Sequence, residues 1–411
     1  MNEREVHVPE RSRRPRKITV AMLAAAGMVL AVCGDVDADA ESASGVSGDP
    51  IRLLVIADGE DTPVHIPVLM DGATAAVAAI NEAGGVNGRP IELDECDSRL
   101  DPNAAADCAR QAASGGYAAI VGSLTSTDAA IVPVAEEAGI AMIGLIPTTA
   151  ASYSSPNSFP IHQGSSVKAV ALSRAVVEAG ASKVSFLYLD VPSAAAFVPV
   201  LEAGVEQNGA ELGRSVGVPA GAPDMSSYVA NALSDGVDGV VLFTTAGDAA
   251  KMVQAIRDSG ADDVVIGFAV SNANDLIDAL GDDAEGLVTA SSQRQVSETD
   301  HPGVAQYVEE MENAGLEPGN SEYSFNSWAS VHLFAEVAAT LTDVTPEGVL
   351  EAMATATYDS GGLYPDLDFA EPVTDLPISA GAPRIFTSEV EFVTVEDGGL
   401  VPTSDFVDLV G

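Results

Sequence analysis

Hydrophobic positions along the chain form short continuous runs that alternate with longer amphipathic or alanine-rich stretches. A run such as residues 51–56, apolar and rich in β-branched side chains, predicts a strand buried on both faces of a parallel sheet. A stretch such as residues 68–83 predicts a helix, and Gly84 and Gly85 supply the left-handed conformation in which helices commonly end. Regular alternation of the two kinds of segment predicts an α/β fold with helices on both faces of parallel sheets.

The alternation falls into two runs, residues 50–160 and 166–290, which predicts two doubly wound parallel-sheet lobes with a cleft between them. The predicted strands are residues 51–56, 91–93, 117–121, 141–145, 184–189, 237–243 and 264–268. The predicted helices are residues 68–83, 102–113, 127–138, 167–179, 194–208, 225–233, 248–259, 274–280, 301–314 and 325–342. After residue 345 the chain becomes richer in Pro, Gly and β-type segments.

The N-terminal segment is typical of a secretory signal. A basic stretch is followed by the uncharged residues 18–32, which are few for a membrane-spanning helix but suit the apolar part of a signal peptide over residues 1–32. Leu30-Ala31-Val32-Cys33-Gly34 resembles a bacterial lipobox, in which the cysteine is acylated and becomes the new N-terminus. Val32 stands where a small residue is usual, so an ordinary secretory signal or an uncleaved anchor remains an alternative to a lipid on Cys33.

The charge balance excludes several classes of partner. The 411 residues include 18 Lys+Arg and 61 Asp+Glu, for a net charge of −43. Such a surface repels polyanions and anionic lipid, so we expect no nucleic-acid partner and no docking on membranes through a basic patch. Residues 33–49 are small and acidic, which predicts a disordered tether between an anchor and the folded body.

The cysteines other than Cys33 are Cys96 and Cys108, which lie 12 positions apart, at the end of a predicted strand and inside the next helix. Outside the cytoplasm an even pair of this kind favours a disulfide. Two free thiols are the alternative. Three cysteines with no histidine nearby do not make a zinc site, and we expect neither metal nor cofactor.

Residues 79–90, AINEAGGVNGRP, begin a series of motifs that continues with DPNA at 101–104, IVGSLTS at 120–126 and EEAGI at 136–140. The series resembles extracytoplasmic solute-binding proteins of ABC transporters, of the branched-chain amino-acid (leucine-binding) type. The similarity covers roughly residues 50–345.

The resemblance implies a type I periplasmic-binding-protein fold, in which two lobes are joined by a three-segment hinge and close on a ligand. The chain would cross between the lobes near residues 162–165, 291–296 and 342–345. Lobe 1 would then comprise residues 50–163 and 295–343, and lobe 2 residues 164–294 and 344–411. Ligand would bind between the carboxyl ends of both sheets, as the general rule for open α/β sheets also predicts.

Two loops at predicted strand ends, residues 122–127 and 146–149, present hydroxyl and backbone N–H groups that suit a carboxylate or another polar acceptor. By resemblance, Ser126 and Thr148 match positions that bind the ligand carboxylate, and Leu124 matches an apolar wall. Thr125 and Thr149 are neighbouring candidates. The alternative is that Ser126 and Thr127 merely cap the helix that follows.

The second lobe departs from the pattern of the family. By resemblance, Ser193, Thr245 and Ala269 occupy ligand-facing positions, and Ala269 stands where the family has the acid that receives the ligand ammonium. A carboxylate, amide or other compact amphipathic ligand therefore fits as well as an α-amino acid. The acids that offer a substitute partner for an ammonium group, each also interpretable as a helix-start or surface residue, are Asp190, Asp248 and Asp275.

Two further side chains call for interpretation. His65 follows the first strand in a loop that faces the cleft in such folds, so it is either a ligand contact or a surface histidine. Trp328 has Phe325 and His332 at helical spacing, which indicates core packing.

Enzyme motifs such as a P-loop, a dinucleotide fingerprint, H-E-x-x-H or G-x-S-x-G are missing from the sequence, and we expect no catalytic residues. The resemblance implies a monomeric, lipid-anchored, extracytoplasmic binding protein that captures a small amphipathic solute by hinge closure and delivers it to an ABC permease. Without a lipid on Cys33 the protein would be secreted. A ligand sensor feeding a receptor, or a secreted hydrolase, remains the alternative.

Overall fold

The computed structural model describes residues 46–62, 65–195, 197–269, 273–376 and 381–410. The predicted signal peptide, Cys33 and most of the predicted tether lie outside these residues, as does the side chain of Ser193. Within the described part, no helix is long and apolar enough to cross a membrane.

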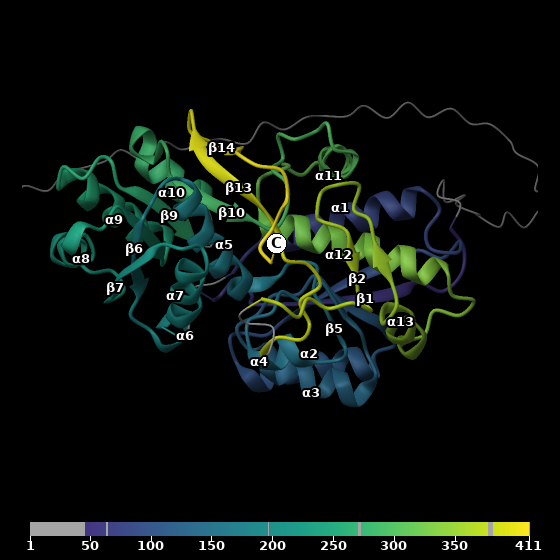
Figure 1. Ribbon diagram of the computed structural model, residues 1–411. Coiled ribbons are helices and arrows are strands. Elements are labelled where there is room, and N and C mark those ends of the chain that lie inside the picture. The colour runs from purple at the N-terminus through teal and green to yellow at the C-terminus, as the bar shows by residue number, and fades with distance from the viewer. Residues whose placement is uncertain (1–45, 63–64, 196, 270–272, 377–380, 411) are drawn as a thin grey trace, which may run out of the picture. The chain divides into compact units, whose positions relative to one another are not determined.

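The first sheet is parallel and has the strand order β2-β1-β3-β4-β5 (Figure 1). Its strands are β1 (Ile51–Ala57), β2 (Ile91–Asp97), β3 (Tyr117–Val121), β4 (Met142–Ile143) and β5 (Ser158–Phe159). Strand β1 alternates its side chains between two buried clusters, with Leu53 and Val55 on one face and Leu54 and Ile56 on the other. This period of two places helices on both faces of the sheet.

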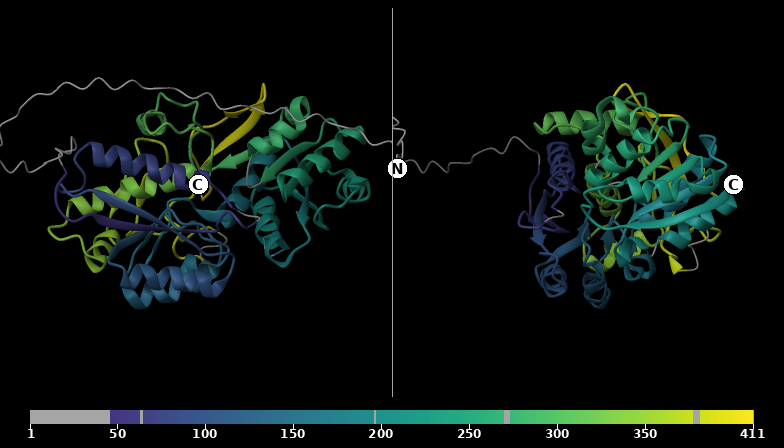
Figure 2. Two further views of the ribbon diagram at one scale, coloured as in Figure 1. Left: turned by 180° about the vertical axis from the view of Figure 1, so that it is seen from behind. Right: turned by 90° about the vertical axis from the view of Figure 1, so that its left-hand side faces the viewer.

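The helices of the first core divide between those faces, as Figure 2 shows for the groups α1–α12 and α2–α3. One face carries α1 (Val68–Glu82), α11 (Pro302–Asn313), α12 (Glu322–Ala339) and α13 (Pro346–Met353), and the other carries α2 (Pro102–Ser114) and α3 (Asp128–Ala138). The short elements α4 (Ala150–Ser154), β11 (Thr357–Tyr358) and β12 (Leu367–Asp368) complete this half of the chain. Asp101 caps α2 by accepting hydrogen bonds from the N–H groups of Asn103 and Ala104, as its position before Pro102 predicts.

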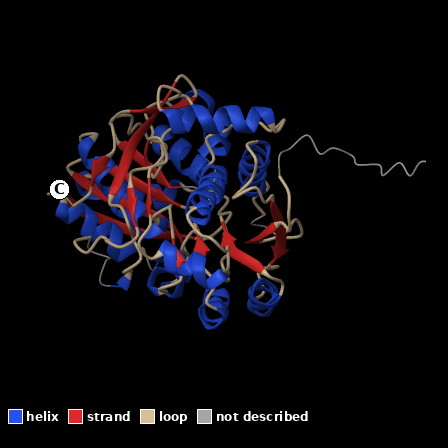
Figure 3. Ribbon diagram, turned by 90° about the vertical axis from the view of Figure 1, so that its right-hand side faces the viewer, coloured by secondary structure: helices blue, strands red, loops and turns tan. Residues whose placement is uncertain are grey.

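The second sheet has the order β14-β13-β10-β9-β8-β6-β7, and helices flank its strands (Figure 3). Its strands are β6 (Lys183–Leu189), β7 (Glu211–Val218), β8 (Gly239–Phe243), β9 (Val265–Ala269), β10 (Val288–Ser291), β13 (Glu389–Glu396) and β14 (Gly399–Pro402), with β15 (Val407–Asp408) paired to β13. Helices α5 (Gly164–Glu178) and α7 (Val198–Gln207) cover one face, and α8 (Ser226–Ala232), α9 (Ala246–Asp258) and α10 (Ala273–Leu280) cover the other. Strands β6 to β10 are parallel, and β13 and β14 extend the sheet with antiparallel pairing.

The chain passes between the two cores three times. Ile161 belongs to the first core and α5 to the second, so the first passage lies at about residues 162–163. The second follows β10, where the N–H of Arg294 donates to the carbonyl of Leu363. Beyond the predicted third passage near residues 342–345, α13, Phe369 and Phe386 still pack in the first core, while Ile385 and Val390 pack with α5.

Most predicted elements are confirmed, and the differences have physical reasons. Strand β4 is shorter than the predicted 141–145, and the predicted helix 194–208 is divided into α6 (Pro192–Ala195) and α7. Edge strand β7 is missing from the prediction because the exposed polar residues Glu211, Arg214 and Ser215 and two glycines interrupt the apolar run that a central strand would have. Before residue 345 the sequence pattern missed α4, β5, β7 and β10; after it, the pattern missed α13 and indicated β-type segments without the individual strands β11 to β15.

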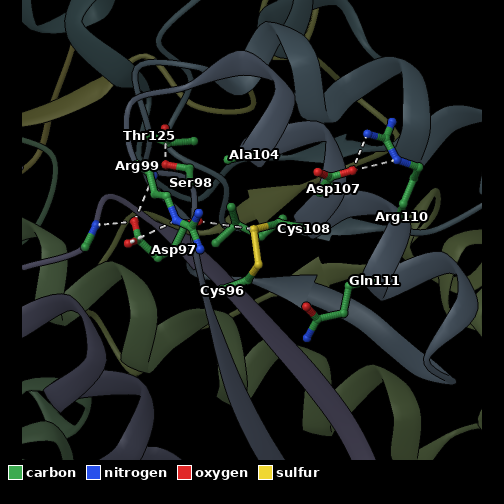
Figure 4. The surroundings of a disulfide bond; sticks show 12 residues. Cys96, Asp97, Ser98, Arg99, Ala104, Asp107, Cys108, Arg110, Gln111 and Thr125 are labelled. Atoms are coloured by element: carbon green, nitrogen blue, oxygen red, sulfur yellow. Dashed lines mark hydrogen bonds and ion pairs between the residues drawn. A yellow bond between two sulfur atoms is a disulfide. The ribbon is translucent and has the colours of Figure 1, made fainter.

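Cys96 of β2 and Cys108 of α2 form a disulfide, as their spacing favours (Figure 4). The bridge closes a loop of 12 residues that carries the turn between β2 and α2. A cross-link that closes a loop of this length lowers the conformational entropy of the unfolded chain. This stabilises the folded protein by about 3 kcal/mol.

We therefore predict that the double variant Cys96→Ala/Cys108→Ala loses about 3 kcal/mol of unfolding free energy in urea titrations. Reductant should destabilise the wild type by a similar amount and leave the double variant unchanged. A wild type whose unfolding midpoint does not respond to reductant would contradict this prediction.

Candidate ligand-binding cleft

The larger cavity, about 650 Å³, lies where strand ends of both sheets meet, as the rule for open α/β sheets predicts. Ala57 ends β1 and Asp58 follows it, and Phe268 and Thr289 come from β9 and β10 of the second sheet. Residues 65–69 contribute the start of α1, and the segment 319–323 contributes the start of α12. The cavity therefore has polar and apolar walls from both cores.

A smaller and more apolar cavity of about 340 Å³ lies at the ends of β6, β8 and β9. Leu189, Phe243 and Ala269 stand at these strand ends, and Phe197 packs on Phe243 with ring centroids 5.2 Å apart. Thr244 also lines this cavity, and its hydroxyl oxygen is buried without a hydrogen-bond partner among the described atoms. The aromatic pair suits the apolar part of a ligand.

An ion pair separates the two cavities and lines both. Nζ of Lys168, on α5, lies 2.8 Å from Oε2 of Glu322, the first residue of α12. His162 joins them, because Gly164 N–H donates to its Nδ1 and so leaves Nε2 to donate to the same carboxylate oxygen at 3.3 Å. Burial alone would raise the pKa of Glu322, but the charge of Lys168 and the hydrogen bond from His162 hold it well below its ordinary value.

Glycine fixes the backbone at the first passage. Gly164 has φ +79°, and a Cβ there would lie 2.0 Å from the hydroxyl of Tyr153. No other residue fits this turn into α5 without moving Tyr153. The turn holds His162 and Lys168 on the side where Glu322 lies.

The loop after β3 reaches the larger cavity with two of the predicted residues, Leu124 and Ser126. The Ser126 hydroxyl is exposed and makes no hydrogen bond in the described part of the chain. Thr127 is the N-cap of α3, but its side chain makes no capping hydrogen bond. Ser126 thus has a hydroxyl that is available to a ligand.

The other predicted residues of the first core line neither cavity. The Thr148 hydroxyl donates to the carbonyl of Thr125, and the Thr149 hydroxyl donates to the carboxylate of Asp128. Thr125 is fully buried and donates to Asp58. These hydroxyls hold the loops of the first core together, so any role of Thr125, Thr148 and Thr149 at a ligand is indirect in this arrangement.

In the second core, Thr245 and Ala269 line the smaller cavity. Thr245 also caps α9 by accepting from the N–H of Asp248. Of the acids proposed as ammonium partners, Asp275 lines the larger cavity, Asp190 lines neither cavity, and Asp248 pairs with Lys251 at 3.0 Å.

His65 and Trp328 differ in environment. His65 lines the larger cavity with its Nδ1 3.0 Å from the carbonyl oxygen of Asp58. Trp328 is 2% exposed and packs edge-on against Tyr307, as the predicted core role requires.

Sequence reasoning missed several polar residues of the cleft: Asp58, Lys168, Gln293, Glu322 and Tyr323. The position of Asp58 in the sequence could have identified it as a cleft residue, because it directly follows a buried strand, as the loop at residues 122–127 does. Lys168 and Glu322 carried none, since they are 154 residues apart and meet only in the folded chain. Among the described residues, no group of His, Cys, Asp and Glu side chains could hold a metal ion.

The comparisons with known proteins agree with this geometry. A family model described as "Periplasmic binding protein" matches residues 67–375. No curated protein sequence matches the chain.

Solved structures extend the likeness over most of the chain. The fatty acid ABC transporter substrate-binding protein from Thermomonospora curvata is 20% identical with a TM-score of 0.71, covering 89% of this chain and 94% of its own. The branched-chain amino acid transporter substrate binding protein of Streptococcus pneumoniae, in complex with isoleucine, is 18% identical with a TM-score of 0.69, covering 87% and 99%. A solute binding protein of R. palustris, in complex with 4-hydroxybenzoate, is 19% identical with a TM-score of 0.69, covering 88% and 97%. At these identities the likeness shows the shared fold.

The ion pair leads to a prediction about pH. Glu322→Gln should lower the free energy of unfolding at neutral pH by about 3 kcal/mol, because Lys168 is left in the cleft wall without its partner. Since folding lowers the pKa of Glu322, its contribution is complete above the unfolded value of about 4.3 and is lost as the pH falls through the folded value. The difference between wild type and variant should therefore shrink below about pH 4.

Urea unfolding at several pH values measures this difference. The exposed acid Glu317 provides a control, and Glu317→Gln should change stability by less than about 0.5 kcal/mol. Equal losses in the two variants, or a loss in Glu322→Gln that does not depend on pH, would contradict the account.

Proposed function

Because this chain belongs to the periplasmic binding protein family, we propose that it captures a small amphipathic solute outside the cytoplasm and delivers it to an ABC importer. The observation that carries the proposal is the cleft at the carboxyl ends of two sheets, with walls from both cores. A solute that contacts both walls favours the closed arrangement of the cores over the open one. The role is binding, without a catalytic step.

The two cavities support an amphipathic ligand. Ser126 and the polar wall of the larger cavity suit a polar head group, while Phe197 and Phe243 of the smaller cavity suit an apolar body. The structural neighbours named above are described as binding isoleucine or 4-hydroxybenzoate, or as serving a fatty acid transporter. We propose that this chain takes a ligand of the same general kind, a branched-chain amino acid or a related carboxylate or amide.

Membrane attachment through Cys33 is the further part of the proposal. An acylated cysteine followed by the acidic residues 34–49 would hold the binding protein near its permease on a flexible tether. Without acylation of Cys33, cleavage of the signal would give a secreted protein, and an uncleaved signal would itself anchor the chain.

A thermal-stability panel of amino acids, keto acids, amides and aromatic acids tests the binding function. A true ligand at about 100 times its Kd should stabilise the full-length protein by about 2.7 kcal/mol. Chromatography after incubation should recover the compound unchanged. A panel without any stabilising compound, or one that yields a converted product, would contradict the proposed function.

Phe243→Ala should weaken binding of the stabilising compound about tenfold, because the apolar part loses its aromatic wall. Tyr228→Ala is the matched control and should leave affinity unchanged, because Tyr228 is a partly buried residue of α8 that packs against the cluster on the other sheet face. Titration calorimetry measures both. Equal affinities of Phe243→Ala and wild type would remove the smaller cavity from the binding site.

A further inference from the structure

We propose that Asp58 selects the charge of the ligand, by accepting a hydrogen bond from a protonated amine of the solute. The inference rests on the proposed binding function and adds the residue that recognises the charge and the class of solute that it admits. Sequence resemblance placed the ammonium partner in the second core, where Ala269 stands. Asp58 belongs to the first core.

Asp58 follows β1 directly, lines the larger cavity and is 5% exposed. Its three hydrogen bonds all reach one oxygen, Oδ1, from the hydroxyls of Ser98 and Thr125 and from the N–H of Leu100. The other oxygen, Oδ2, accepts no hydrogen bond within the described part of the chain. One half of the carboxylate is thus fixed in place, and the other half remains for a ligand.

No cationic side chain forms an ion pair with Asp58 among the described residues. Buried carboxylates in proteins are normally paired or surrounded by donors, because desolvation of a charge is costly. A carboxylate that lacks a cation and faces a cavity is therefore a candidate for binding a cation from outside the chain.

Asp128 is an acid of the same core with a purely structural role, and its hydrogen bonds differ from those of Asp58. It is fully buried, and its two oxygens accept four hydrogen bonds, from the N–H groups of Thr148 and Thr149 and from the hydroxyls of Thr149 and Ser152. It lines neither cavity. Asp128 is saturated by donors of its own chain, whereas Asp58 is not.

A second unpartnered group lines the same cavity. Gln293, in the second passage between the cores, is 5% exposed, and its Oε1 is buried without a hydrogen-bond partner among the described residues. A ligand that donates N–H groups would satisfy an acceptor of this kind. Asp58 belongs to the first core and Gln293 to the passage between the cores, so such a ligand would contact the first core and the connecting segment together.

The turn that positions the Asp58 carboxylate has an unfavourable backbone conformation. Arg99 and Leu100 have φ values of +56° and +53°, a left-handed conformation that is unfavourable for both. This conformation places Ser98 and the Leu100 N–H on Asp58, beside the Cys96–Cys108 disulfide, and Figure 4 shows Ser98 and Thr125 in contact there. The disulfide closes the loop that contains this turn.

The charges around the cavity favour the same class of ligand. Among the described lining residues, the acids are Asp58, Asp275 and Glu322, and the lysine, Lys168, is paired with Glu322. His65 also lines the cavity, with its Nδ1 at the backbone carbonyl of Asp58 and not at the carboxylate. An anion without a compensating amine would meet uncompensated negative charge. We therefore expect an amine or a zwitterion with an apolar body to bind, and a simple carboxylate of the same shape to be rejected.

Four probes that share a branched five- or six-carbon skeleton test the charge selection on the full-length protein: leucine, 3-methylbutylamine, 4-methyl-2-oxopentanoate and 4-methylpentanamide. In calorimetric titrations, a probe with an ammonium group should bind about tenfold or more tightly than the keto acid and the amide. Asp58→Asn should remove most of this preference. Equal or tighter binding of the keto acid or the amide, or a preference that survives in Asp58→Asn, would overturn the inference.

A melting measurement without ligand separates a binding role from a structural one. Asp58→Asn keeps an oxygen for the three donors and removes an unpaired charge, so it should melt at or above the wild-type temperature. Asp128→Asn should melt lower, because donors of the chain lose an acceptor. A lower melting temperature for Asp58→Asn than for Asp128→Asn would make Asp58 structural and overturn the inference. If neither these probes nor the wider panel bind at all, the proposed function itself fails, and this inference fails with it.

Discussion

The ion pair between Lys168 and Glu322 is the interaction on which the cleft depends, because it joins the first helix of the second core to the longest helix of the first. Both side chains line both cavities, so their geometry sets the boundary between the polar and the apolar part of the site. His162 lies at the first passage of the chain and adds a hydrogen bond to the same carboxylate oxygen. Opposite charges at short distance in a poorly hydrated wall hold the two cores in a defined arrangement around the cleft.

Hydrogen bonding within the first core separates residues that shape the cleft from residues that are free to bind. Thr125, Thr148 and Thr149 use their hydroxyls to connect loops, and Asp128 collects four donors. Within the described part of the chain, the Ser126 hydroxyl and one carboxylate oxygen of Asp58 make no hydrogen bond. The same polar residue types therefore serve two purposes, and their internal partners show which purpose each one serves.

The architecture was predictable because apolar runs and helix ends are local signals. Strands β1, β3, β6 and β9 carry such runs, and Asp101-Pro102 marks the start of α2. The chain's end was less predictable, since α13 joins the first core through scattered apolar residues such as Val349 and Met353. Short β4 and β5 depend on pairing with neighbours more than on their own sequence.

The cleft was predictable only at its strand-end loops. Leu124, Ser126, Thr245 and Ala269 lie at a cavity, because parallel strands bring their carboxyl ends to one edge. Pairs that meet across the two cores, such as Lys168 and Glu322, leave no trace in spacing or periodicity. The use of a hydroxyl for an internal bond, as in Thr148, is likewise decided by the folded neighbours.

Amide hydrogen exchange with and without the stabilising compound tests the central claim that one solute is held by both cores. Binding between the cores should slow exchange in residues 122–127 of the first core, in residues 243–246 of the second and in residues 291–295 at the passage between them, because both walls become closed to solvent. Protection confined to one core, or spread equally over surfaces remote from the cleft, would contradict the account.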